Sequence, residues 1–205
     1  MSNPRLLTLD YSNRQIAGVA LFLGTLQFVL AMNLAEQLYP NYSVSANYIS
    51  DLGATCTTTC TIVQPSSTIF NSSVIILGLL ILVGAYFINR EFHSRLFTVL
   101  LGLTTVGAVG VGVFPETTGI LHVIVSFIVF FFGSLSALSS FRVTKKPFNY
   151  FSVVLGILSL IALGLFFANA YLGLGPGGME RMIAYPDLLW GIALGGNLMH
   201  SPKSP

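Results

Sequence analysis

Six apolar stretches, each about as long as a bilayer is thick, dominate this sequence. A hydrocarbon core roughly 30 Å thick needs about 20 helical residues to cross it. Because lipid offers no partners to backbone amides, unbroken apolar stretches of this length predict helices and exclude the short alternating strands of a membrane barrel. The sequence therefore predicts an all-α integral membrane bundle of six transmembrane helices. They cover approximately residues 15–35, 69–89, 96–114, 118–141, 148–172 and 179–199.

Charged residues are too scarce for a soluble fold. They make up 8% of the chain, and 54% of its residues are hydrophobic, whereas an ordinary soluble domain is about 25% charged. The six stretches use most of the 205 residues, which predicts one membrane domain over residues 1–205 in a multi-pass protein of the cell membrane. The first stretch is longer than the apolar region of a secretion signal and lacks a small-x-small cleavage site, so we interpret it as a permanent helix.

The basic residues predict the orientation, because Lys and Arg near helix ends stay preferentially in the cytoplasm. In a six-helix arrangement only Arg181 falls on the outer side, and both chain ends are predicted to be cytoplasmic. The inner side holds Arg5, Arg14, Arg90, Arg95, Arg142, Lys145, Lys146 and Lys203. This basic face suits anionic lipid headgroups, and the small number of charges argues against nucleic-acid binding.

One connection is long, the predicted outer loop of residues 36–68, and long ordered loops in small proteins are often functional. Cys56 and Cys60 lie in it on the oxidising side of the membrane, so a disulfide between them is the preferred interpretation. A metal site would need further ligands, and none is obvious nearby. Asn41 begins an Asn-Tyr-Ser glycosylation acceptor and is the candidate for modification.

Ionisable side chains near the membrane gather in the outer half, and each calls for a functional hypothesis and a partner. They are Asp51, Glu116, His122, Glu180, Arg181 and Asp187. In one interpretation, the Gly-rich segment 174–178 is not helical, and the free amides that follow it bind an anion together with Arg181. In the structural alternative, Glu180 caps those amides and Arg181 pairs with Asp51, Glu116 or Asp187.

Catalytic interpretations are weaker. Zinc requires several nitrogen ligands, but His122 is the one histidine on the outer side, so we predict no metal and no cofactor. A hydrolase that pairs His122 with Ser50 or Ser126 is possible. The spacing of Gly107, Gly110 and Gly112 resembles a nucleotide-binding loop, but the strand that such a loop requires does not precede it. The spacing of Gly191 and Gly195 is typical of close helix packing.

Short motifs spread along the chain resemble a known family. They are Asn47-Tyr-Ile-Ser-Asp-Leu-Gly53, Ile69-Phe-Asn71, Gly112-Val-Phe-Pro-Glu116 followed by His122, Met179-Glu-Arg181, and Trp190. Together they resemble the prokaryotic, largely archaeal membrane proteins catalogued as domain of unknown function 998, over nearly all of the chain. The resemblance implies a single-domain membrane bundle and supplies no activity and no catalytic residue.

Three classes of function fit these features, and none assigns an enzymatic reaction. The first is binding or processing of a membrane lipid or other amphiphile at the outer polar cluster. The second is a non-catalytic accessory subunit of a larger membrane complex, with partner subunits or as a homo-oligomer. The third is a small transporter, which ranks last because the predicted bilayer midplane offers little polarity beyond Gln27, Ser126 and Ser159.

Overall fold

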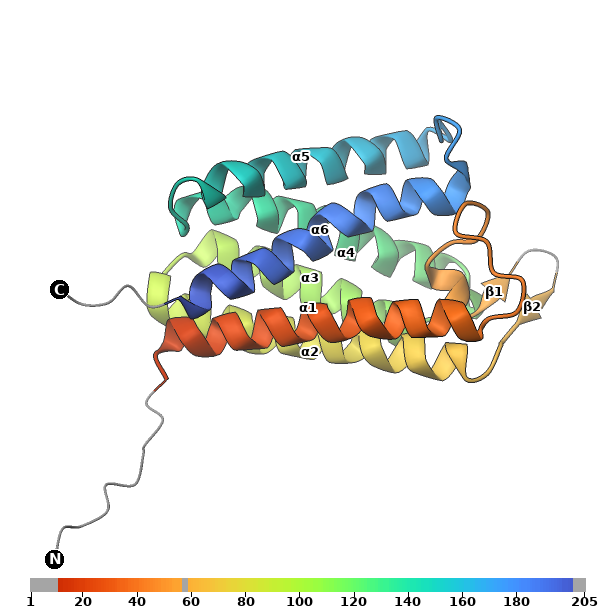
Figure 1. Ribbon diagram of the computed structural model, residues 1–205, viewed down its shortest axis with the longest axis horizontal. Coiled ribbons are helices and arrows are strands. Elements are labelled where there is room, and N and C mark those ends of the chain that lie inside the picture. The colour runs from red at the N-terminus through yellow and green to blue at the C-terminus, as the bar shows by residue number, and fades with distance from the viewer. Residues whose placement is uncertain (1–10, 57–58, 201–205) are drawn as a thin grey trace, which may run out of the picture.

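A bundle of six long helices forms the structure, a computed structural model that describes residues 11–56 and 59–200 (Figure 1). The helices are α1 (Asn13–Leu38), α2 (Ser66–Phe92), α3 (Arg95–Val113), α4 (Ile120–Ser139), α5 (Phe148–Phe167) and α6 (Gly175–Met199). The predicted all-α fold is confirmed. Helices α1 to α5 are long and apolar enough to cross a membrane, as in a multi-pass membrane protein.

Helix α6 is not among the helices that are long and apolar enough to cross a membrane, and the bundle shields its charges. It packs against α1 and α5. Glu180 and Arg181 are buried, whereas Met182, Tyr185 and Leu189 on the opposite face are exposed. This separation follows the helical repeat, in which residues three and four apart share a face. The helix therefore turns its apolar face outward, as the other five helices do.

Both ends of the described chain lie at one end of the bundle, opposite the short strands β1 (Thr55–Cys56) and β2 (Cys60–Thr61) (Figure 1). The guanidinium of Arg14 in α1 donates a hydrogen bond to the carbonyl of Asn197 in α6, at 3.2 Å. This arrangement agrees with an even number of crossings. Arg5 and Lys203 lie outside the described residues, and the cytoplasmic location of the termini stays a prediction.

The connection between α1 and α2, residues 39–65, folds over one end of the bundle and is named the outer loop. It contains the 3-10 turn η1 (Ser50–Leu52) and the antiparallel pair of β1 and β2, in which Cys56 faces Cys60. The predicted disulfide between these cysteines is present. Asn41 is exposed in this loop, and its glycosylation stays a prediction.

Two predicted helix boundaries are wrong around the turn from α5 to α6. Helix α5 stops at Phe167 rather than at residue 172, because Asn169 and Leu172 adopt positive φ values of 56° and 51° that no helix continues. Helix α6 begins at Gly175, within the Gly-rich segment expected to be non-helical. Pro176 in the first turn supplies a φ angle that suits a helix start.

Backbone of the outer loop completes the start of α6. The amides of Gly177 and Gly178 donate to the carbonyl of Ser45 at 2.9 and 3.4 Å. A Cβ at Gly177 would collide with the carbonyl of Asn47, so this glycine allows the loop to approach. The amides that a helix start normally leaves open are therefore bonded to the protein itself.

Two further 3-10 turns complete the chain. One is η2 (Glu116–Thr118), between α3 and α4, which packs beside β1 at the same end as the outer loop. The other is η3 (Ser140–Arg142), which follows α4. The η2 turn matters for function because it brings Glu116 under the outer loop.

Candidate functional site

The six residues predicted as one outer polar cluster separate into distinct groups. Arg181 joins the outer loop to α1 and α6, Asp51 and Glu116 organise the η1 and β1 segment, and Glu180 reaches that segment from α6. His122 forms a separate pair within α4, and Asp187 lies deeper. The hydrogen bonds of the six residues define these groups.

Arg181 is only 3% exposed, and its two terminal nitrogens donate to protein groups, whereas its Nε has no hydrogen-bond partner within the described residues. Its Nη2 lies 2.6 Å from Glu36 Oε1 in α1, and it also donates to the hydroxyl of Tyr42 at 2.6 Å. Its Nη1 donates to the carbonyls of Val44, Asn47 and Gly177. The expected pairing with Asp51, Glu116 or Asp187 is wrong, because the last turn of α1 places Glu36 nearer to the start of α6.

The anion-binding interpretation of the α6 start is not supported by this geometry. The carbonyl of Ser45 accepts from the first amides, and Glu36 neutralises Arg181. The predicted capping role of Glu180 is also wrong, since its carboxylate instead accepts a hydrogen bond from the backbone amide of Ile49 in the outer loop. These contacts use the charges to fasten the outer loop to α6.

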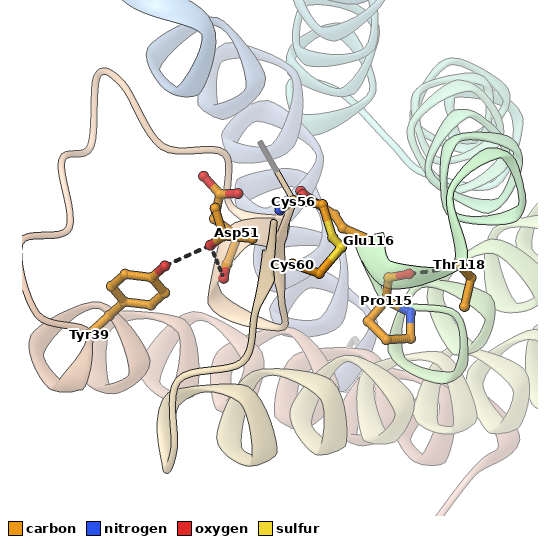
Figure 2. Close-up of a disulfide and its surroundings, with 8 residues drawn as sticks. Tyr39, Asp51, Cys56, Cys60, Pro115, Glu116 and Thr118 are labelled. Carbon is orange, nitrogen blue, oxygen red and sulfur yellow. Dashed lines mark hydrogen bonds between the residues drawn. A yellow bond between two sulfur atoms is a disulfide. The ribbon is translucent and has the colours of Figure 1, made fainter. Parts of the chain in front are cut away.

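Glu116 and Asp51 hold the part of the outer loop that carries the disulfide. Ser50 Oγ donates to Glu116 Oε1 at 2.7 Å, and the amide of Cys56 donates to Oε2 at 3.1 Å. Figure 2 shows Glu116 beside the Cys56–Cys60 disulfide. Asp51 Oδ2 accepts from Asn47 Nδ2 and from the amide of Tyr48, both at 2.9 Å. The two carboxylates therefore fix the loop from opposite sides.

Burial raises the pKa of the Glu116 carboxyl above its ordinary value of 4.5, and the nearby charge of Asp51 adds to this effect against the opposing bonds from Ser50 and Cys56. A carboxyl whose pKa is raised in the folded state binds more protons folded than unfolded. Its contribution to stability is therefore complete below its unfolded pKa and is lost as the pH rises through the folded pKa.

We therefore expect the Glu116→Gln variant to lose less stability than the wild type as the pH rises from about 4 to neutrality. Thermal unfolding in detergent across this range measures the difference between the two proteins. Gln retains one oxygen that can accept from Ser50, but its amide nitrogen cannot accept from Cys56, so the comparison is between the slopes of the two pH profiles rather than between absolute stabilities. Two parallel pH profiles would contradict the assignment to Glu116.

His122 and Ser126 form a hydrogen-bonded pair on one face of α4. His122 Nδ1 lies 2.8 Å from the carbonyl oxygen of Phe114, and Ser126 Oγ lies 3.3 Å from His122 Nε2. A carbonyl oxygen only accepts, so Nδ1 carries the proton, Nε2 is the acceptor, and the serine hydroxyl donates. Of the two serines considered for His122, Ser50 instead bonds to Glu116.

These groups line a cavity of about 390 Å³ between α4, α5 and the outer loop. Its polar lining residues are Tyr48, Ser50, Cys56, Glu116, His122, Ser126 and Glu180. Its apolar lining residues are Val123, Phe127, Phe130, Leu163, Phe166 and Phe167. Val123, Phe127 and Phe167 are also exposed, so the cavity opens between α4 and α5 on the outside of the bundle.

Sequence reasoning missed the α5 wall of this cavity and the role of Tyr48. The phenylalanines at the end of α5 look like ordinary lipid-facing residues, and no local pattern relates them to the outer loop. In the structure, the ring of Tyr48 packs edge-on against Phe166, with 5.8 Å between centroids. The Asn47–Gly53 motif, singled out for the family resemblance, was the one available signal.

Asp187 lies apart from Arg181, beside a smaller and more apolar cavity of about 110 Å³. Ser134 Oγ in α4 donates to Asp187 Oδ2 at 3.2 Å, and the same hydroxyl contacts Ser159 of α5 at 2.7 Å. Within the described residues, Asp187 Oδ1 has no hydrogen-bond partner. Glu180 and Ser126 line both cavities, so the two spaces are neighbours.

Metal ligands do not converge at these cavities. Across residues 11–56 and 59–200, no group of three or more His, Cys, Asp or Glu side chains is arranged to hold a metal ion. The polar side of the larger cavity instead offers hydroxyl, carboxyl and imidazole groups, which suit hydrogen bonding and proton transfer.

A comparison with protein families gives one match. A family model described as "Protein of unknown function (DUF998)" matches residues 22–197, a range that includes α2 to α5, most of α1 and α6, and every lining residue of the two cavities except Leu21. No curated protein and no solved structure matches the chain significantly.

Proposed function

The chain belongs to the DUF998 family of proteins of unknown function, and from the geometry of its site we propose that it binds an amphiphile in the cavity between α4, α5 and the outer loop. The observation that carries this proposal is a cavity of about 390 Å³ lined by both aromatic and polar residues, with an opening between two helices that are long and apolar enough to cross a membrane. Its size lies within the usual range of about 300–1,000 Å³ for small-molecule sites.

The two kinds of lining residue match the two ends of an amphiphile. Phe127 and Phe167 stand at the opening with their rings 5.7 Å apart, where an alkyl chain entering from the bilayer would contact them. Most of the polar lining residues belong to the outer loop, η2 and the start of α6, and we place the headgroup at that end of the bundle. A ligand in this position buries its chain against the phenylalanines and places its headgroup beside Glu116, His122 and Ser126.

The charges of the site select the kind of headgroup. Among the described residues that line the cavity there is no Lys or Arg, and two carboxyl groups are present. The one outer cation that could attract an anion, Arg181, is neutralised by Glu36. A phosphate or carboxylate headgroup would meet acidic groups without compensation, so the proposed ligand has an uncharged, hydroxyl-bearing or a cationic headgroup.

The test uses monoolein, a single-chain amphiphile with an uncharged glycerol headgroup, and oleic acid as its anionic counterpart. Native mass spectrometry of the detergent-purified protein measures how much of each lipid binds. We expect monoolein to bind in preference to oleic acid. We expect the Val123→Trp variant, which fills the opening, to weaken monoolein binding by about tenfold or more, since a filled pocket excludes the chain.

Ile124→Trp is the matched control. Val123 and Ile124 are neighbours on α4 and are 49% and 48% exposed, but only Val123 lines the cavity. Ile124→Trp should bind monoolein as the wild type does. Equal loss in both variants, or tighter binding of oleic acid, would contradict the proposed site.

A further inference from the structure

We propose that Ser126 is a nucleophile, activated by His122, which cleaves a carboxylic ester in the bound amphiphile. This inference rests on the proposed function, because it assigns a reaction to the same cavity. It adds a substrate class, namely an ester of a hydroxyl-bearing headgroup. It also assigns a catalytic residue to each step.

The hydrogen bond of Ser126 is unusual for a hydroxyl group inside a helix. Serine and threonine hydroxyls inside membrane helices usually donate to the carbonyl one turn earlier. In this chain Thr25, Ser72, Thr104, Ser136 and Ser152 do so. Within the described residues, the partner of Ser126 is instead the Nε2 atom of His122. Its proton therefore points to a base rather than to backbone.

His122, the base, is held in the orientation that catalysis requires. An activated nucleophile requires a base within hydrogen-bond reach, and the base in turn requires a third group that orients it. The carbonyl of Phe114, at the end of α3, accepts from His122 Nδ1 at 2.8 Å. It fixes the ring and leaves Nε2 free to accept the serine proton. The distance of 3.3 Å between Ser126 Oγ and His122 Nε2 is within the range seen before substrate binds.

The pair of Ser126 and His122 is accessible from the larger cavity, which both residues line. They share α4 with the apolar lining residues Val123 and Phe127, so an ester group, which lies between the alkyl chain and the headgroup of an amphiphile, can reach them. Tyr48 lines the same cavity, and its phenol is the hydroxyl donor that we assign to the developing oxyanion.

The reaction balances without a metal ion or a redox partner. Ser126 Oγ attacks the ester carbonyl carbon while its proton moves to His122 Nε2. The ester C–O bond then breaks, and the leaving alcohol takes the proton from His122. Water next attacks the acyl-serine, gives its proton to His122, and releases the carboxylic acid as the proton returns to Ser126 Oγ.

The experiment measures the covalent labelling of Ser126 by an alkyl fluorophosphonate, a reagent that phosphonylates activated serines with loss of fluoride. Mass spectrometry of the purified full-length protein identifies the labelled residue and its rate of labelling. We expect labelling at Ser126, none in Ser126→Ala, and a rate at least about 100-fold lower in His122→Asn, the range expected for loss of a general base. The amide of Asn can still donate to the Phe114 carbonyl.

Ser72→Ala serves as the control, since Ser72 is an exposed helix serine outside both cavities, and it should label as the wild type does. Binding of the ether analogue of monoolein, which has no ester bond to cleave, is measured on the same proteins. Binding without labelling at Ser126 would overturn the catalytic inference and leave the binding proposal intact. If the wild type shows neither binding nor labelling, the binding proposal and the catalytic inference are both overturned. Equal labelling of several serines, or labelling unchanged in His122→Asn, would also overturn the inference.

Discussion

Replacing Arg181 with Met should lower the free energy of unfolding by about 3–5 kcal/mol, the usual cost of removing one partner of a buried ion pair. The variant leaves the Glu36 carboxylate, whose side chain is only 12% exposed, without its cation. It also deprives the hydroxyl of Tyr42 and the carbonyls of Val44 and Asn47 of their donor. Thermal unfolding in detergent measures the effect.

Two further variants make this result specific. Arg90→Met removes an exposed arginine whose guanidinium contacts Tyr86 in its own helix, and it should change stability by no more than about 0.5 kcal/mol. The double variant Arg181→Met with Glu36→Gln removes the orphaned charge and should recover part of the loss. An unchanged melting temperature for Arg181→Met would show that the outer loop is not fastened through this residue.

The second large effect is expected from Gly195→Val, at the contact of α6 with α1. A Cβ at position 195 would lie 2.6 Å from the amide nitrogen of Phe22 and 2.8 Å from the carbonyl oxygen of Gly18. Both are backbone atoms, so the two helices must separate. Overpacking of this kind costs about 1–3 kcal/mol or more, and valine adds two methyl groups beyond the Cβ. We expect reduced yield of folded protein and a lower melting temperature.

Gly196→Val is the neighbouring control, because no atom lies within 4 Å of a Cβ built at Gly196. Both variants replace a helical glycine, so helix propensity affects them alike and the difference between them reports the contact with α1. Size-exclusion chromatography and thermal unfolding compare the two. Equal behaviour would mean that α1 and α6 do not pack at the distance that Gly195 allows.

Hydropathy was sufficient to predict the helices, because a membrane helix satisfies its backbone within one segment. Each of the apolar stretches corresponds to one of the six helices. The Gly191 and Gly195 spacing predicted a close helix contact, and the structure has it. The pair of His122 and Ser126 was also accessible from the sequence, since residues four apart in a helix are neighbours. These features depend on residues close together in the chain.

The sequence by itself determined the membrane bundle, the disulfide between Cys56 and Cys60, and the facing positions of His122 and Ser126. Only the tertiary structure decided that Arg181 pairs with Glu36, 145 positions away, and that α5 completes a cavity under the outer loop. Several acids were equally plausible partners for one cation. The choice among them depends on how distant helices and loops pack, and no local pattern of charge or hydropathy contains that information.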